Sequence, residues 1–235
     1  MENISCNSKL NKSINYYGSE RKDVFSIFPD GVDSVLDVGA GSGNVGARLK
    51  EKGINRVVGI EVSREAAELA KSKIDEVIVG DVENYPFNFN EKFDTILFLD
   101  VLEHLKDPWS VLVKMNKYLK DGGAYILSVP NIRYYRVLLN IIFKGEFKYE
   151  EQGILDIGHL RFFTYKMLKQ YLDQAGFKIV RVKRNFSGHI SWLANTISLN
   201  IFADFFTRQY IVLAIEKVVN ENVLKEGKKE KYSER

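Results

Sequence analysis

The feature that most constrains the fold of this chain is an alternation of short apolar segments with amphipathic ones. The apolar runs are rich in valine, isoleucine and leucine and lack the polar alternation of a half-exposed sheet. Strands of this kind are typical of a parallel sheet covered by helices on both faces. We expect such strands at residues 34–39, 56–61, 76–81, 93–100 and 124–130. The pattern predicts a doubly wound α/β sheet that binds ligands at the carboxyl ends of its strands.

Capping residues mark where the intervening helices begin. Ser63 precedes one helix, Asp107 and Pro108 open another, and Thr164 caps a third. Two strands follow the last of these helices without a second glycine-rich loop, which weighs against a symmetrical dinucleotide-binding fold. The expected helices span residues 44–53, 64–74, 108–120 and 165–176, and the late strands span residues 177–185 and 208–218.

Composition indicates one globular domain. The 235 residues are 45% hydrophobic and 28% charged, as in ordinary soluble proteins. The net charge of +3, without a stripe of lysine and arginine, argues against nucleic acid. Cys6 is the only cysteine, so we expect a reducing cytoplasm; no signal peptide or membrane span is predicted. The expected division is a tail at 1–12, one domain at 13–219 and a charged tail at 220–235.

The stretch "VLDVGAGSGNVG", residues 35–46, contains two glycine patterns that point to different ligands. Gly39, Gly41 and Gly43 fit the G-x-G-x-G turn of an S-adenosylmethionine site. Gly41, Gly43 and Gly46 fit the dinucleotide fingerprint G-x-G-x-x-G. In that fingerprint the first glycine normally leaves the strand directly, and counting from Gly39 the third position falls on Asn44. The spacing therefore disfavours a nicotinamide cofactor.

Acidic residues near three successive strand ends support the same conclusion. Asp37 suits a site that holds a sulfonium and an ammonium group, and Glu61 suits ribose hydroxyls. Asp81 suits the exocyclic amine of adenine, with the backbone N–H of Val82 beside it. The three carboxylates together favour S-adenosylmethionine, with S-adenosylhomocysteine as product.

With these motifs in place, the sequence resembles the class I S-adenosylmethionine-dependent methyltransferases. Five segments carry the likeness in the family's order: "VLDVGAGSGNVG", "VVGIEVS", "IVGDVENYPF", "FDTILFLDVLEHLKDP" and "LKDGGAYILSVPN". A longer likeness is to the branch of ubiquinone-pathway O-methyltransferases and sugar-modifying enzymes. The resemblance implies a Rossmann-like, mostly parallel seven-stranded sheet with an antiparallel last strand and a helical cap insertion.

The resemblance also implies which residues contact the cofactor. One departure is Ala40, where many relatives have cysteine, and its small side chain should be harmless. Tyr17 is a candidate lid, and His104 is expected to pack over the adenosine. The implied set is Asp37, Gly39, Ala40, Gly41 and Gly43 at the methionine end, Glu61 and Val62 at the ribose, Asp81 and Val82 at the adenine, and Asp100 and Val101 beneath the sulfur.

Catalysis requires a base if the acceptor is a hydroxyl, and histidine is a natural one. His159 is our first candidate, because it lies in "GILDIGHLRFFT" with Asp156 before it and Arg161 after it. These groups could deprotonate an acceptor, or they could form a structural hydrogen-bond knot. His104 and Glu103 follow the fourth strand and are further candidates, His104 as a base and Glu103 to orient a substrate amine or hydroxyl. We nevertheless expect Glu103 to be exposed. His189 is expected to be a bystander, and no metal-ligand spacing is evident.

Two apolar segments stand outside this scheme. The insertion at about 131–163 contains Val137, Leu138, Ile141 and Ile142 beside basic residues. Such a helix can lie on a membrane, but we expect it to pack on the domain and shape the acceptor pocket. The apolar segment at about 186–207 is expected to be core first, a dimer interface second and lipid-contacting third.

We therefore predict methyl transfer to a small-molecule acceptor, most simply a hydroxyl oxygen of a sugar, quinone-like or lipid-linked compound. N-methylation of an amino-sugar or another amine is the alternative. An NAD-dependent oxidoreductase and a non-catalytic cofactor-binding protein are alternatives of another class. The acceptor and the choice between monomer and homodimer stay open at this stage.

Overall fold

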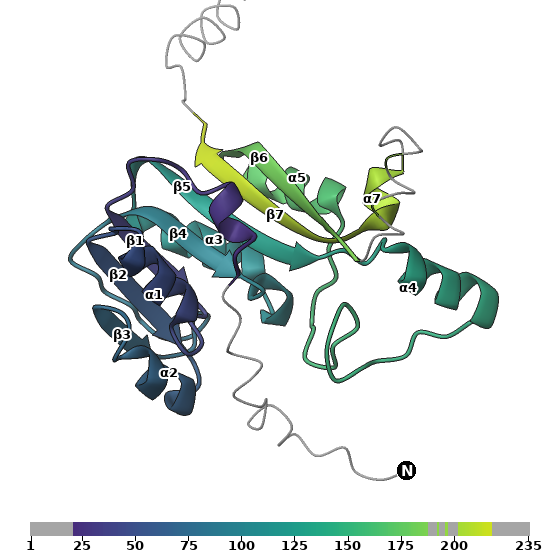
Figure 1. The fold of residues 1–235 in the computed structure, drawn as a ribbon, viewed down its shortest axis with the longest axis horizontal. Coiled ribbons are helices and arrows are strands. Elements are labelled where there is room, and N and C mark those ends of the chain that lie inside the picture. Colours follow the sequence, from purple (N-terminus) through teal and green to yellow (C-terminus); the bar gives the residue numbers. More distant parts are fainter. Residues whose placement is uncertain (1–20, 188–191, 193–195, 197–201, 218–235) are drawn as a thin grey trace, which may run out of the picture.

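The computed structural model describes residues 21–187, 192, 196 and 202–217. Within these residues seven strands form one sheet in the order β3-β2-β1-β4-β5-β7-β6 (Figure 1). β1 to β5 are mutually parallel, while β7 runs antiparallel to both β5 and β6. The predicted sheet is confirmed, including its antiparallel last strand. The strands are β1 Ser34–Val38, β2 Arg56–Glu61, β3 Glu76–Val79, β4 Phe93–Leu99, β5 Leu119–Pro130, β6 Phe177–Phe186 and β7 Thr207–Glu216.

Helices cover both faces of the sheet, and the strands contribute alternate side chains to each cover. Leu36 and Ile96 belong to the apolar cluster that includes residues of α3 and α5, whereas Val35 and Leu97 belong to the cluster that includes residues of α1. This period of two is the geometric consequence of a pleated strand buried on both sides. The helices are α1 Asn44–Glu51, α2 Arg64–Ala70, α3 Pro108–Met115, α4 Tyr135–Leu139, α5 Tyr165–Gln174 and α7 Ala203–Phe206.

The strand order reverses next to β1. From β1 the chain adds β2 and then β3 on one side, and then returns to add β4 on the other side. The loop after β1 therefore lies at the point where the strand order reverses. Doubly wound sheets bind their ligands at this position.

The helix expected to run to about Lys120 ends earlier, at Met115, and a 3₁₀ turn over Asn116–Tyr118 follows it. β5 then begins at Leu119, which pairs with Phe93 before the register shifts between Phe93 and Thr95. The prediction was wrong because it took the two glycines after Asp121 as the end of a helix. Those glycines instead lie within an irregular start of the strand.

The cap insertion contains α4, which continues as a π-helical turn over Asn140–Lys144. The expectation that its apolar face packs on the domain holds for only half of that face. Val137 is buried and Leu138 is half-buried, but Ile141 and Ile142 are exposed. Among the described residues, no helix is long and apolar enough to cross a bilayer.

Several expectations concern residues outside the described ranges. They include both tails, Tyr17, His189 and most of the segment at 186–207. The described end of that segment contains α7, where Ala203 is buried. Thr207 is also buried, and its hydroxyl donates to the carbonyl of Ala203 at 2.7 Å.

Candidate active site

A cleft of about 1220 Å³ opens at the carboxyl ends of the central strands. Its walls come from the loop after β1, the ends of β2 and β4, and the cap insertion. Predicted site residues that line it are Asp37, Gly39, Ala40, Gly41, Glu61, Val62, Asp81, Val82, Asp100, Val101, Glu103, His104 and His159.

The loop after β1 is a tight backbone cradle. Gly39, Gly41 and Gly43 all have positive φ angles, of 77°, 56° and 76°, which glycine adopts without strain. The N–H groups of Gly39 and Ala40 donate to the carbonyl of Ile60 on β2. A Cβ atom on Gly39 would overlap the side chain of Val101. Glycine is therefore needed here for both its backbone conformation and its lack of a side chain.

Glu61 locks this cradle to the second strand. Its carboxylate accepts one hydrogen bond from the N–H of Gly41 and another from the N–H of Ser63, both at 2.8 Å. The side chain is buried yet belongs to the wall of the cleft. The residue expected at the ribose therefore also fixes the shape of the glycine loop.

Asp37 lies under the loop and is only 2% exposed. Burial, together with the nearby charge of Glu61, raises the pKa of Asp37 to about 7. A carboxyl group in this position is readily stabilised in its charged form by an incoming cation.

Asp81 and Val82 form the wall beyond β3. The carboxylate of Asp81 accepts from the N–H of Glu83 at 2.9 Å and from the side-chain amide of Asn84 at 2.8 Å. Asp81 thereby organises a turn that carries the buried side chain of Val82 into the cleft wall. Val62, at the end of β2, lines the same region but is largely exposed.

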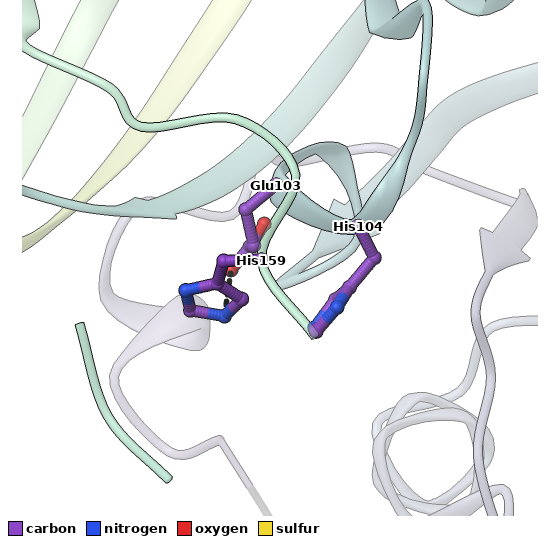
Figure 2. A group of neighbouring side chains, drawn as sticks. All are labelled: Glu103, His104 and His159. Atoms are coloured by element: carbon purple, nitrogen blue, oxygen red, sulfur yellow. Dashed lines mark ion pairs between the residues drawn. The ribbon is translucent and has the colours of Figure 1, made fainter. Parts of the chain in front are cut away.

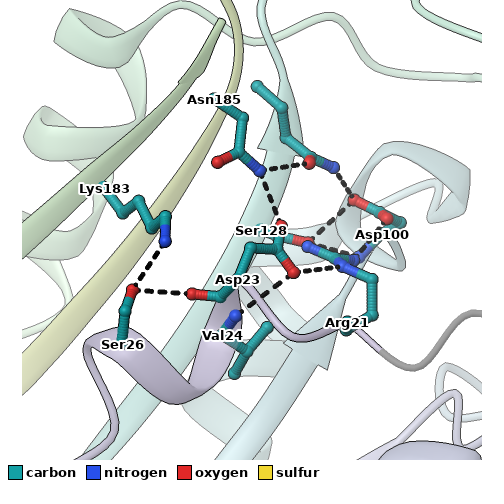
Figure 3. A network of polar contacts seen from close by, with 9 residues as sticks. Arg21, Asp23, Val24, Ser26, Asp100, Ser128, Lys183 and Asn185 are labelled. Carbon is teal, nitrogen blue, oxygen red and sulfur yellow. Dashed lines mark hydrogen bonds and ion pairs between the residues drawn. The ribbon is translucent and has the colours of Figure 1, made fainter.

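Asp100, directly after β4, is part of a polar network that joins β5, β6 and β7 to the start of the described chain (Figure 3). Its backbone has a φ of 59°, and its carboxylate accepts from Ser128 and Gln209. Arg21 lies 2.5 Å from the other carboxylate oxygen and also pairs with Asp23. Arg21 lines the cleft, and sequence reasoning missed it because the charged run at 20–23, before the first strand, matches no site motif.

Glu103, His104 and His159 come together although the first and last are 56 positions apart in the sequence (Figure 2). The Nδ1 atoms of His104 and His159 each lie 3.0 Å from a backbone carbonyl, of Gly158 and Ile154 respectively. A carbonyl only accepts, so both Nδ1 atoms carry the proton in these contacts. The Nε2 atom of His159 lies 4.0 Å from a carboxylate oxygen of Glu103.

The expectation that Glu103 is exposed is wrong, since only 1% of it is accessible. Its backbone carbonyl accepts from the N–H groups of Leu160 and Arg161, so the cap loop covers it. One ligand atom each from Glu103, His104 and His159 lie within 4.8 Å of one another, a spacing that could hold a metal ion. The cluster joins distant segments, which is why spacing along the chain did not reveal it.

Two predicted residues lie off the cleft wall. Arg161 is absent from the lining, and its guanidinium donates to the carbonyls of Lys106 and Leu160. Gly43 is the N-cap of α1, where its backbone has a φ of 76°. Asp156 does line the cleft, but its carboxylate accepts from the N–H of Gly158, as expected for a structural knot.

With the geometry established, we compared the chain with known proteins. A family model described as a methyltransferase domain matches residues 10–182. The chain is a class I S-adenosylmethionine-dependent methyltransferase. The predicted family, fold and enzyme class are thereby confirmed, and a nicotinamide oxidoreductase finds no support.

Two relatives and one solved structure illustrate this similarity. An uncharacterised protein of Methanocaldococcus jannaschii is 32% identical over 68% of this chain and 67% of its own length. A ubiquinone biosynthesis O-methyltransferase of Actinobacillus pleuropneumoniae is 27% identical over 72% of this chain and 77% of its own. A solved S-adenosylmethionine-dependent methyltransferase of Archaeoglobus fulgidus shares the fold, with a TM-score of 0.63, 18% identity and coverage of 89% and 97%.

S-adenosylmethionine is the cofactor of the methyltransferase, and the residues present fit it. Gly39 and Gly41 line the cleft without a side chain, so a ligand can approach the backbone of the loop closely. Asp37 offers a carboxyl group whose ionisation a cationic ligand would favour.

Proposed function

We propose that this methyltransferase transfers a methyl group to the hydroxyl oxygen of a small molecule, with His159 as the general base. The observation that carries the proposal is the setting of His159 in the wall of the cleft that also contains the glycine cradle. Its Nδ1 proton is donated to the carbonyl of Ile154, which leaves Nε2 as a proton acceptor.

The cofactor, when bound, supplies a methyl group on a sulfonium sulfur that is already a strong electrophile. The protein then has to align the acceptor, exclude water and remove the hydroxyl proton. In our proposal the loop at Gly39 to Gly43, with Asp37 and Glu61, holds the methionine and ribose parts. Asp81 and Val82 hold the adenine, and Asp100 and Val101 form the floor beneath the reacting carbon.

Glu103 and His104 act on the base rather than on the methyl group. Glu103 lies 4.0 Å from Nε2 of His159, where a carboxylate stabilises the imidazolium formed by proton removal. The ring of His104 stands edge-on to that of His159, with centroids 4.7 Å apart, and restricts its orientation. We therefore treat both as positioning residues.

The similarity to ubiquinone-pathway O-methyltransferases supports oxygen over nitrogen as the methylated atom. Hydroxyl acceptors need a base, whereas a neutral amine can attack without one. The proposed base and the O-methyltransferase relatives agree on this point, and they favour a catechol- or quinol-like acceptor for the first trials.

The experiment is a turnover assay on a panel of catechols, quinols, sugars and amines, with S-adenosylhomocysteine formation as the readout. We expect a hydroxyl acceptor to react, and His159→Ala to lower kcat by about 10²- to 10⁴-fold. Calorimetric binding of S-adenosylhomocysteine should be unchanged in that variant. Turnover restricted to amines, or full activity of His159→Ala, would reject the proposal.

A matched control separates catalysis from loop structure. Asp156→Asn alters another buried cap residue, whose carboxylate contacts the N–H of Gly158. We expect Asp156→Asn to lower the melting temperature while leaving the pH dependence of kcat in place. His159→Ala should instead change the pH dependence of kcat, because it removes the group that takes the acceptor proton in our proposal.

A further inference from the structure

The tip of the cap insertion is unusually apolar for an exposed segment. Every residue from 139 to 150 is exposed. Ile142 and Phe143 are the most accessible large apolar side chains there, at 69% and 78%. We call the group Leu139, Ile141, Ile142 and Phe143 the cap face.

The cap face is held in place by other residues of the insertion and by α7. Val137 is buried with Tyr134, Ile154 and Leu155 in a small apolar cluster. The ring of Tyr135 packs on two phenylalanine rings of α7, at centroid distances of 5.9 and 5.7 Å. The helix is thus anchored, and its exposed apolar side chains are not the result of an unattached segment.

The helix ends at the cap face. Gly145 follows the π-helical turn with a φ of 65°, and its N–H donates to the carbonyl of Ile141. The chain therefore turns directly after Phe143 and Lys144. Figure 1 shows α4 beyond the ends of β5 and β7, at the periphery of the molecule.

Basic side chains accompany the cap face. Residues 133–148 include Arg133, Arg136, Lys144 and Lys148, all exposed, against a single acidic residue, Glu146. Arg133 lies 3.9 Å from Asp204, so part of its charge is balanced within the protein. Residues 133–148 therefore carry a net positive charge.

We propose that the cap face docks on an anionic lipid surface. Apolar side chains at a helix tip with lysine and arginine around them match the acyl boundary and the negative headgroups of such a surface. A second copy of the chain fits less well, because a twofold contact would bring the same basic groups together. The proposal concerns this surface alone and does not rest on the chemistry of the cleft.

The test is sedimentation of the full-length protein with vesicles of phosphatidylglycerol and phosphatidylcholine, and with vesicles of phosphatidylcholine alone. We expect binding to the mixed vesicles that weakens as salt is added, and much weaker binding to the neutral ones. The double variant Ile142→Asp with Phe143→Asp should bind at least about tenfold more weakly. Each of Lys144→Gln and Lys148→Gln should weaken binding by about fivefold.

Val113→Asp is the matched control. Val113 is an apolar residue of α3 with 58% exposure, distant in sequence from the cap. The control should bind vesicles as the parent protein does, and circular dichroism should show that all variants are folded. Absence of binding to the mixed vesicles, or binding unaffected by the double variant, would overturn the proposal. A dimer in analytical ultracentrifugation that the double variant dissociates would assign the cap face to a second copy instead.

Discussion

At the scale of single residues, Asp37 is both buried in the fold and part of the cleft wall. Burial and the neighbouring Glu61 keep its carboxyl group protonated well above the pH at which an ordinary aspartate ionises. A cationic ligand reverses this preference, because it favours the charged form. In our proposal Asp37 holds the cofactor, so protons and cofactor compete for one carboxyl group.

We expect the affinity for S-adenosylmethionine to rise as the pH increases from 6 to 8. The pKa of Asp37 is about 7 in the free protein, so binding at pH 6 has to release a proton that is already lost at pH 8. Calorimetry in buffers of different ionisation enthalpy measures the released proton directly. Asp37→Asn should weaken binding and remove the pH dependence, and a release that persists in this variant would assign the proton to another group.

The raised pKa of Asp37 also predicts how the stability of the fold changes with pH. In the unfolded chain Asp37 ionises near pH 4, so between about pH 4 and 7 the folded state binds more protons than the unfolded state. The contribution of Asp37 to the free energy of unfolding therefore falls as the pH rises through this range. Asp37→Asn should therefore raise the melting temperature more at pH 8 than at pH 5. An equal effect at both values would contradict the assigned burial of charge.

Gly39→Ala should abolish cofactor binding and lower the free energy of unfolding by about 1–3 kcal/mol. The added methyl group would overlap Val101, and the backbone has a φ of 77°. Gly53→Ala is a matched control with a φ of 91° but no atom within 4 Å of the added group. Denaturant unfolding should show the smaller loss for Gly53→Ala, and Val101→Ala should partly rescue Gly39→Ala.

Extensive dialysis against EDTA should leave turnover unchanged. In our proposal Nε2 of His159 takes the acceptor proton, so it is not a metal ligand. Loss of activity that a divalent cation restores would assign the cluster of Glu103, His104 and His159 to metal binding and remove His159 from the role of base.

At the scale of elements, the network around Arg21 ties the start of the described chain to the far strands. Asn185 on β6 donates to Asp23 at 2.6 Å, and Gln209 on β7 donates to Asp100 at 2.6 Å. These contacts connect segments that lie far apart in the sequence. They therefore hold the cleft floor from several directions.

Arg21→Gln should lower the free energy of unfolding by about 1–3 kcal/mol, because it removes the cation beside Asp100. Arg48→Gln is the comparison, since Arg48 pairs with Glu51 on an exposed helix surface. We expect its effect to stay within about 0.5 kcal/mol. Similar losses for the two variants in urea titrations would show that the network around Arg21 is no stronger than a surface pair.

Much of this level of structure could be predicted from the sequence, and the failures come from contacts between segments that are distant in the sequence. β1 and β2 begin and end within one residue of the prediction, because continuous apolar runs and glycines mark their ends. The end of α3 was misplaced because the pairing of Leu119 with Phe93 depends on a neighbouring strand. The burial of Glu103 was missed because it is covered by Leu160 and Arg161, which lie 57 and 58 positions later in the sequence.

At the scale of the whole molecule, one sheet separates two apolar clusters, and every central strand contributes to both. Loss of either cluster exposes the same strands, so we expect the domain to unfold in one cooperative step. Trp109 packs against one of these clusters and stacks on Tyr171, with ring centroids 3.8 Å apart. Its fluorescence should therefore report the unfolding of that cluster.

Denaturant unfolding of Trp192→Phe, followed by fluorescence of Trp109 and by circular dichroism, should give coincident transitions. The substitution removes the second of the two tryptophans, so that the fluorescence reports only Trp109. Two separated midpoints would divide the chain into independently stable parts and contradict a single domain.

The place of β7 in the sheet has a further consequence, for the way the protein is made. β7 comes after β6 in the sequence but lies between β5 and β6. A nascent chain that has emerged from the ribosome only as far as β6 therefore exposes the unpaired edge of β5, and β6 has no neighbour. Unpaired edges of this kind invite contact with other chains. We therefore expect this chain to be most prone to association with other chains in the period between synthesis of β6 and insertion of β7.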